Sequence, residues 1–333
     1  MASAEVATTA TQRPSGEGTS GETTPARSHS PSRRRWRRTW AARALFLMLV
    51  PGAVYLLIYK YGPMYGVLIA FKDYSIRDGI LGSPWADPWY GHFAEFITSP
   101  FFGSLMTNTV LISLYKLLWG TIPPILVALL FNECRQVWFR RIAQTVSYMP
   151  HFLSWVIIYG VAIALLSQGT GVFNGFLRDT FGFSIPFLTS NDWFRSVLVI
   201  SDVWKDIGWG AIIYFAAMVG IDRSYYEAAM VDGAGRLRQI WHITLPGIRP
   251  VIILLLVLKL GGILDAGFDQ VFIFYNVQVY PSGDIIDTWV YRAGLENLNY
   301  SLAAAVGLFK SVIGLVLIVV ANRIAKRWNA QLW

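Results

Sequence analysis

The chain has 333 residues, of which 54% are hydrophobic and 14% are charged, and its net charge is +8. A soluble domain usually carries about 25% charged residues, so this composition excludes an ordinary soluble enzyme. The dominance of apolar residues excludes a wholly disordered chain, and a polytopic membrane protein is the class that remains. The single cysteine, Cys134, excludes an internal disulfide and a cysteine-based metal cage.

The first 40 residues differ in composition from the rest of the chain. Residues 1–32 are rich in Ser, Thr, Gly and Pro, and a basic cluster follows over residues 33–38. We therefore predict a disordered basic cytoplasmic tail over residues 1–40. The apolar run that comes next imitates a signal peptide, but no cleavage site follows it, which favours a retained membrane helix. Beside such a helix, a basic cluster contacts anionic lipid more often than nucleic acid.

Six segments are long and apolar enough to cross about 30 Å of hydrocarbon as helices. They cover residues 42–61, 105–131, 142–166, 194–220, 248–268 and 301–322. With the N-terminus in the cytoplasm, Lys and Arg lie on the inner side roughly three times as often as on the outer side. We therefore predict an all-α polytopic membrane protein with six transmembrane helices, a six-helix domain over residues 41–330, and both termini cytoplasmic. The long outer loops over residues 62–104 and 269–300 either dock an extracytoplasmic partner or pack over the bundle.

The cytoplasmic loop over residues 221–246 carries the most specific pattern. Ser224 is a suitable N-cap, with Glu227 at the capping-box position three residues later. Asp232 and Gly233 should end that helix, and a second short helix should end at Leu245-Pro246 before span five. The loop is therefore predicted to form a compact helix–turn–helix elbow. From these residues alone, it is either a surface for another protein or a polar connector.

The elbow resembles the EAA loop of importer permeases of the ATP-binding cassette (ABC) class. The residues that carry the resemblance are Glu227, Ala228, Ala229, Asp232, Gly233, Ala234, Ile243, Leu245 and Pro246. Further segments resemble the LplB-like subgroup of the maltose-type sugar permeases, namely residues 61–63, 70–74, 82–85, 147–150, 204–209 and 287–292. The resemblance covers about residues 41–330.

The resemblance implies a permease subunit that imports oligosaccharides or polysaccharide fragments across the cell membrane. It implies that Glu227 to Ala234 form a coupling helix seated on an ATPase subunit. It further implies a second permease subunit, two ATPase subunits and an extracytoplasmic solute-binding protein as partners. The sequence has no G-x-x-x-x-G-K-[ST] loop, so ATP and magnesium are expected on the separate ATPase, with no cofactor, metal or catalytic site on this chain.

Charged residues within the spans cost about 2.5–3.5 kcal/mol each, which makes them candidates for function. We place eight side chains on a predicted substrate path: Lys116, Asp202, Trp204, Lys205, Asp206, Trp209, Lys259 and Lys310. Tryptophan would stack on sugar faces, and charged groups would bond hydroxyls. The four lysines in this set outnumber its two aspartates, which would tolerate uronate-bearing glycans. In the alternative interpretation, Lys205 pairs with Asp202 and Asp206 and only joins helices.

Three other functions compete with carbohydrate import. An ABC importer permease for a non-sugar solute would keep the same elbow. A self-sufficient secondary transporter would use internal repeats and ion-coupling carboxylates, with no reason to keep an EAA elbow. A membrane enzyme would show a catalytic cluster at one membrane face.

Overall fold

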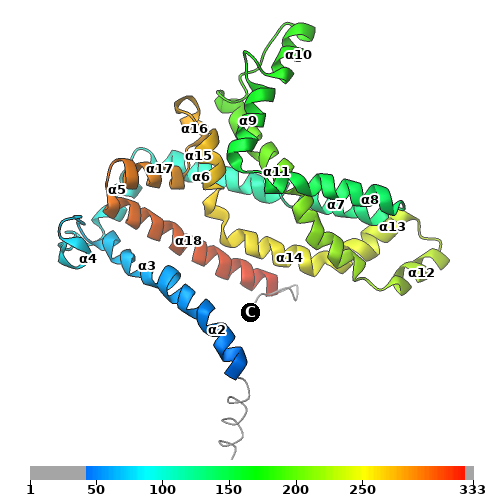
Figure 1. The fold of residues 1–333 in the computed structure, drawn as a ribbon, viewed down its shortest axis with the longest axis horizontal. Helices are drawn as coiled ribbons and strands as arrows, with labels where there is room; N and C mark the ends of the chain where they lie inside the picture. The colour runs from blue at the N-terminus through cyan, green and yellow to red at the C-terminus, as the bar shows by residue number, and fades with distance from the viewer. Residues whose placement is uncertain (1–42, 327–333) are drawn as a thin grey trace, which may run out of the picture. The chain divides into compact units, whose positions relative to one another are not determined.

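The computed structural model of the protein describes residues 43–326, with side chains from residue 46 onward (Figure 1). This part of the chain is helical and contains no β-strand, only an isolated bridge between Lys72 and Trp85. The predicted all-α class is therefore confirmed. The predicted tail over residues 1–40, with its basic cluster, lies outside the described residues.

The first half of the described chain contains helices before, within and after the first long loop. Their bounds are α2 (Arg43–Leu56), η1 (Leu57–Tyr61), α3 (Gly62–Met64), η2 (Tyr65–Phe71), α4 (Gly79–Gly82), α5 (Gly91–Thr98), α6 (Phe102–Trp119), α7 (Ile122–Glu133), α8 (Val137–Tyr148), η3 (Met149–Phe152), α9 (Trp155–Leu166) and α10 (Val172–Phe181).

The second half contains the longest helices. Its elements are α11 (Asn191–Val219), α12 (Arg223–Val231), α13 (Arg236–Gln239), η4 (Ile240–Thr244), α14 (Leu245–Gly261), η5 (Ile263–Asp265), α15 (Phe268–Phe274), η6 (Val277–Val279), α16 (Tyr280–Gly283), α17 (Ile286–Tyr291), η7 (Arg292–Glu296) and α18 (Tyr300–Lys326). The described residues divide into two compact units between Gly62 and Pro63.

Four continuous helical stretches are long and apolar enough to cross a membrane. They are Phe46–Phe71, Phe102–Glu133, Arg236–Gly261 and Tyr300–Lys326, and they overlap predicted spans one, two, five and six. α11 is also long, with 29 residues, but three charged residues lie in its middle. The predicted count of six spans and the predicted orientation of the termini stay predictions.

The third predicted span differs from the expectation of one helix. Residues Val137–Phe152 and Trp155–Leu166 form two helical segments bent by 104° from each other. Pro150 lies in the last turn before the bend, where it has no N–H to continue the ladder. Ser154 is extended and caps the new helix by accepting a hydrogen bond from the N–H of Ile157. A continuous helix over residues 142–166 is therefore wrong, and the pair counts as one broken span at most.

α11 is the central helix of the second unit. It packs against α6, α7, α8 and α14, and these helices lie side by side in Figure 1. Ala128 of α7, Ala211 of α11 and Ile248 of α14 are fully buried in one apolar cluster. Gly208 lies against the backbone of Ser147 in α8, where a Cβ atom would come within 2.1 Å of the carbonyl oxygen. Small residues thus bring these helices close together, as is usual in membrane bundles.

Candidate functional site

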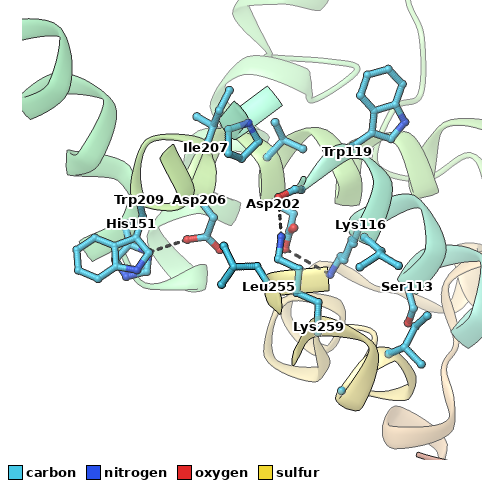
Figure 2. A pocket seen from close by; sticks show the side chains of 18 of the residues that line it. Ser113, Lys116, Trp119, His151, Asp202, Asp206, Ile207, Trp209, Leu255 and Lys259 are labelled. Atoms are coloured by element: carbon cyan, nitrogen blue, oxygen red, sulfur yellow. Dashed lines mark hydrogen bonds and ion pairs between the residues drawn. The ribbon is translucent and has the colours of Figure 1, made fainter. Parts of the chain in front are cut away.

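A cavity of about 400 Å³ lies among α6, α7, α11 and α14, beside the start of α15. Figure 2 shows its charged side chains directed toward the same space. Its wall includes five of the eight side chains that the sequence placed on a substrate path: Lys116, Asp202, Asp206, Trp209 and Lys259. The spacing along α11 explains part of this set, because residues 202, 206 and 209 recur at helical intervals and share one face.

The other three predicted path residues lie elsewhere. Trp204 is 43% exposed, and neither Trp204 nor Lys205 belongs to the cavity wall formed by the described residues. Lys310 lines a second cavity of about 490 Å³ between the end of α14 and α18. Of the five α11 residues in the predicted set, the structure therefore brings Asp202, Asp206 and Trp209 to the cavity and leaves Trp204 and Lys205 outside its wall.

An imidazole–indole stack forms one end of the cavity. The rings of His151 and Trp209 are parallel, with centroids 4.4 Å apart. A hydrogen bond of 2.6 Å joins His151 Nδ1 to Asp206 Oδ1. His151 was missed by sequence reasoning, although the subgroup segment over residues 147–150 ends directly before it. The stack and the carboxylate present an aromatic surface and hydrogen-bond acceptors to the cavity.

Lys116 and Lys259 enter the cavity from opposite helices, and both contact backbone carbonyls. Lys116 Nζ donates to the carbonyl oxygen of Ala266 at 2.8 Å and also to Gln270 Oε1. It lies 3.7 Å from Asp202 Oδ1. Lys259 Nζ donates to the carbonyl oxygen of Gly120 at 2.6 Å. Both ammonium groups are therefore already hydrogen-bonded to protein groups.

Lys205 also bonds backbone. Its Nζ donates to the carbonyl oxygens of His151 and Leu153, both at 2.6 Å, and lies 5.5 Å from the centre of the Trp155 ring. Among the described residues it forms no ion pair with Asp202 or Asp206. The interpretation in which Lys205 pairs with those aspartates is therefore wrong.

Lys310 is paired with two carboxylates that the sequence reasoning did not connect to it. Its Nζ lies 2.6 Å from Asp265 Oδ1 and 2.7 Å from Asp287 Oδ2. When these two aspartates are counted with Asp202 and Asp206, four aspartates balance the charge of the four span lysines. The lysine excess that suggested a uronate-tolerant path is absent from this charge balance.

The elbow over residues 221–246 has the predicted helix–turn–helix form. α12 ends at Val231 with Asp232 as its C-cap, and Gly233 takes a positive φ of 74°, a conformation that glycine adopts at no steric cost. Gly235 precedes α13 in an extended conformation. Glu227, Ala228, Asp232, Gly233 and Pro246 are exposed, whereas Ala229, Ala234 and Leu245 are half-buried.

Two local details of the elbow correct the sequence prediction. The N-cap of α12 is Asp222 rather than Ser224: its Oδ1 accepts from the N–H of Ser224 at 2.9 Å. This hydrogen bonding from Ser224 lowers the pKa of Asp222 below its ordinary value. The second helix also does not end at Leu245-Pro246. It continues through the π-turn η4 into α14, and the wider turn accommodates Pro246, which has no N–H to donate.

One ion pair ties the elbow to the bundle, and one hydrogen bond joins the two arms of the elbow. Arg236 Nη1 lies 3.0 Å from Glu133 Oε2 at the end of α7, and Tyr226 shares a 3.0 Å hydrogen bond with Thr244. The outward surface carries exposed apolar side chains, with Met230 at 59% and Val231 at 89% exposure. Exposed apolar residues on a charged loop are typical of a protein interface.

Residues 120–330 match the family described as binding-protein-dependent transport system inner membrane component. The chain belongs to this family. It is therefore a multi-pass inner membrane component of a binding-protein-dependent transport system, and the predicted resemblance to ABC importer permeases is confirmed.

Individual relatives extend the match beyond the family domain. The chain is 45% identical over 287 residues to protein LplB of Bacillus subtilis (strain 168), which covers 86% of this chain and 90% of LplB. It is 44% identical over 287 residues to the polygalacturonan/rhamnogalacturonan transport system permease protein YteP of the same strain, covering 86% and 89%. A chain of a bacterial alginate ABC transporter, solved with an alginate pentasaccharide-bound periplasmic protein, is 38% identical with a TM-score of 0.81, covering 90% of this chain and 99% of that chain.

Proposed function

We propose that the chain is a permease subunit of an ABC importer that carries oligosaccharides or polysaccharide fragments into the cytoplasm. The observation that carries the proposal is similarity over nearly the whole length of relatives named for polygalacturonan, rhamnogalacturonan and alginate. The elbow and the cavity then receive separate roles, one in energy coupling and one in translocation.

The cavity has chemistry that suits a sugar. The indole face of Trp209, which is 44% exposed, can stack on the C–H face of a pyranose ring. The carboxylates of Asp202 and Asp206 can accept hydrogen bonds from sugar hydroxyls. His151 holds Trp209 and Asp206 in place through one stack and one hydrogen bond. We therefore propose this cavity as part of the translocation path.

Glu227 to Ala234 are proposed to seat on the ATPase subunit. The helix–turn–helix form, the positive φ at Gly233 and the exposed apolar residues beside it support this role. The Arg236–Glu133 ion pair and the continuous helix from α13 into α14 give a rigid connection from the elbow to the bundle. Motion of the ATPase would thus reach α14, which carries Lys259 into the cavity.

The proposed topology keeps six spans with both termini in the cytoplasm. α11 serves as the fourth span, because its charged residues face the cavity or the break before α9 and so avoid lipid. α8 and α9 together serve as a broken third span. A second permease subunit would complete the pore, two ATPase subunits would bind ATP and magnesium, and an extracytoplasmic binding protein would deliver the sugar.

Reconstitution tests the function. The chain is co-expressed with the permease, ATPase and solute-binding protein encoded by neighbouring genes and placed in proteoliposomes. The sugar retained by the purified binding protein is identified by mass spectrometry and then supplied in labelled form. We expect ATP-dependent uptake that requires the binding protein. An assembled complex that takes up none of the retained oligosaccharides, or that takes up a non-sugar solute instead, contradicts the proposal.

A further inference from the structure

Three helix breaks border the cavity. The first separates α6 from α7 at Gly120, the second separates η3 from α9 at Leu153 and Ser154, and the third separates α14 from α15 over residues 262–267. Gly120, His151 and Ala266 bring the three breaks to the cavity wall. The shape of the cavity therefore depends on how these broken ends are held.

Each break releases backbone carbonyls from helical hydrogen bonding. Within a membrane such carbonyls need a partner, either water in a cavity or another protein group. Here the partner in all three cases is a lysine from a different helix. Lys259 of α14 bonds the first break, Lys205 of α11 the second, and Lys116 of α6 the third.

The first and third breaks are bonded reciprocally. Lys116 lies on the helix that ends at the first break and reaches the third, whereas Lys259 lies on the helix that ends at the third and reaches the first. A glycine makes room for the lysine at the third break, because a Cβ atom at Gly267 would collide with Lys116 Nζ. At the first break, a Cβ atom at Gly120 would lie 2.5 Å from the carbonyl oxygen of Lys116, so the close approach there is between backbone groups.

We propose that Lys116, Lys205 and Lys259 are positioning residues, whose ammonium groups hold the three broken helix ends and thereby fix the cavity for transport. They act on the substrate through the breaks that they hold. This inference rests on the proposed transport function. The three lysines would then lie in the spans because they hold helix ends, and not because they select an anionic substrate.

Lys205 separates the two explanations most clearly, because it lies outside the cavity wall and bonds both carbonyls at 2.6 Å. A lysine that selects an anionic substrate has to contact that substrate in the cavity. A lysine that positions a helix end has to bond only the carbonyls at the break. Replacing Lys205 by Met removes the ammonium group and keeps most of the side-chain volume. The break between α8 and α9 should then lose its fixed geometry.

The first readout is a distance across the break in the full transporter. Spin labels are placed at Val146 and Val156, which are exposed on the two sides of the bend, in a Cys134→Ser background. We expect Lys205→Met to broaden or shift the distance distribution. Lys310→Met is the matched control, because Lys310 bonds carboxylates in another cavity, and it should leave this distribution unchanged.

The second readout is uptake. Lys205→Met should lower the maximal uptake rate about tenfold, as expected from loss of charge-assisted hydrogen bonds, while the concentration of loaded binding protein that gives half the maximal rate stays the same. Lys205→Arg, which keeps a cationic donor, should restore part of the rate. If the unmodified complex transports sugar and Lys205→Met matches it in both uptake and distance distribution, the positioning role is overturned. If the unmodified complex transports nothing, it is the proposed function that fails.

Discussion

Substitution of Gly208 by Ala tests how closely α8 and α11 have to approach. A Cβ atom at this position would lie 2.1 Å from the carbonyl oxygen and 2.4 Å from the carbonyl carbon of Ser147. Non-bonded heavy atoms prefer separations of about 3.5–4.0 Å. α8 would thus have to move by roughly 1 Å or more, because the clash is with backbone and no side-chain rotation relieves it.

The magnitude follows from two opposing terms. Overpacking of this kind costs about 1–3 kcal/mol, and a backbone clash belongs at the upper end of that range. Alanine gains about 1 kcal/mol over glycine in a helix interior. We therefore expect Gly208→Ala to lower the free energy of unfolding by about 2 kcal/mol. α8 leads into His151, so the displacement should also disturb the stack on Trp209 and reduce transport.

The assay is reversible unfolding of the reconstituted protein in mixed detergent micelles, together with uptake in proteoliposomes. Gly160→Ala is the matched control, because Gly160 lies within α9 and a Cβ atom there would meet nothing within 4 Å. That variant should be as stable as the parent or slightly more stable. If Gly208→Ala unfolds at the same detergent composition as Gly160→Ala and transports normally, the close approach of α8 and α11 is refuted.

The remaining predictions concern the elbow and the second cavity. Gly233→Ala should weaken co-purification with the ATPase, because a side chain at φ 74° costs about 1–2 kcal/mol, whereas Gly235→Ala, at an extended position, should not. Asp222→Ala should increase hydrogen exchange in the first turn of α12. The cap hydrogen bond lowers the pKa of Asp222. The stabilisation by this cap is therefore present above the unfolded-state pKa and should be lost as the pH falls through the folded-state pKa. Hydrogen exchange of the first turn of α12, measured as a function of pH, would show this loss. Lys310→Met should destabilise the protein by about 2 kcal/mol, since two carboxylates lose their cation. Adding Asp287→Asn should restore part of that loss of stability. A double variant that is no more stable than Lys310→Met contradicts the pairing.

The long apolar helices could be predicted from the sequence because hydropathy over about 20 residues is a strong local signal. The break in the third span is weaker as a local signal, since Pro150 is compatible with a kinked continuous helix. Its actual bend depends on Lys205, which lies 52 and 54 residues away from the carbonyls that it bonds. Contacts over such separations are not visible in hydropathy.

Only part of the candidate site could be predicted, because the sequence shows neighbours within a helix and not neighbours between helices. Asp202, Asp206 and Trp209 could be grouped, because helical spacing places them on one face. His151 could not be placed with them, since it comes from another helix. Lys310 likewise finds Asp265 and Asp287 on two other elements. Sequence spacing determines neighbours within a helix, and tertiary packing determines neighbours between helices.

The lysines in the spans show why charge alone is a poor guide to substrate. A lysine has three donors at the end of a flexible stem, so it can cross the 8–10 Å between packed helix axes and serve two carbonyls at once, as Lys205 does. Shorter hydroxyl side chains often donate to a carbonyl of their own helix, as Ser147 does to Ala143 and Ser311 to Gly307. The cost of burying the cation is offset where an aspartate lies nearby, as Asp202 does for Lys116. In this fold, three of the four lysines within the spans bond carbonyls at a break in a neighbouring helix, and the fourth, Lys310, bonds two carboxylates. Partners within the protein therefore explain these lysines before an anionic cargo is needed.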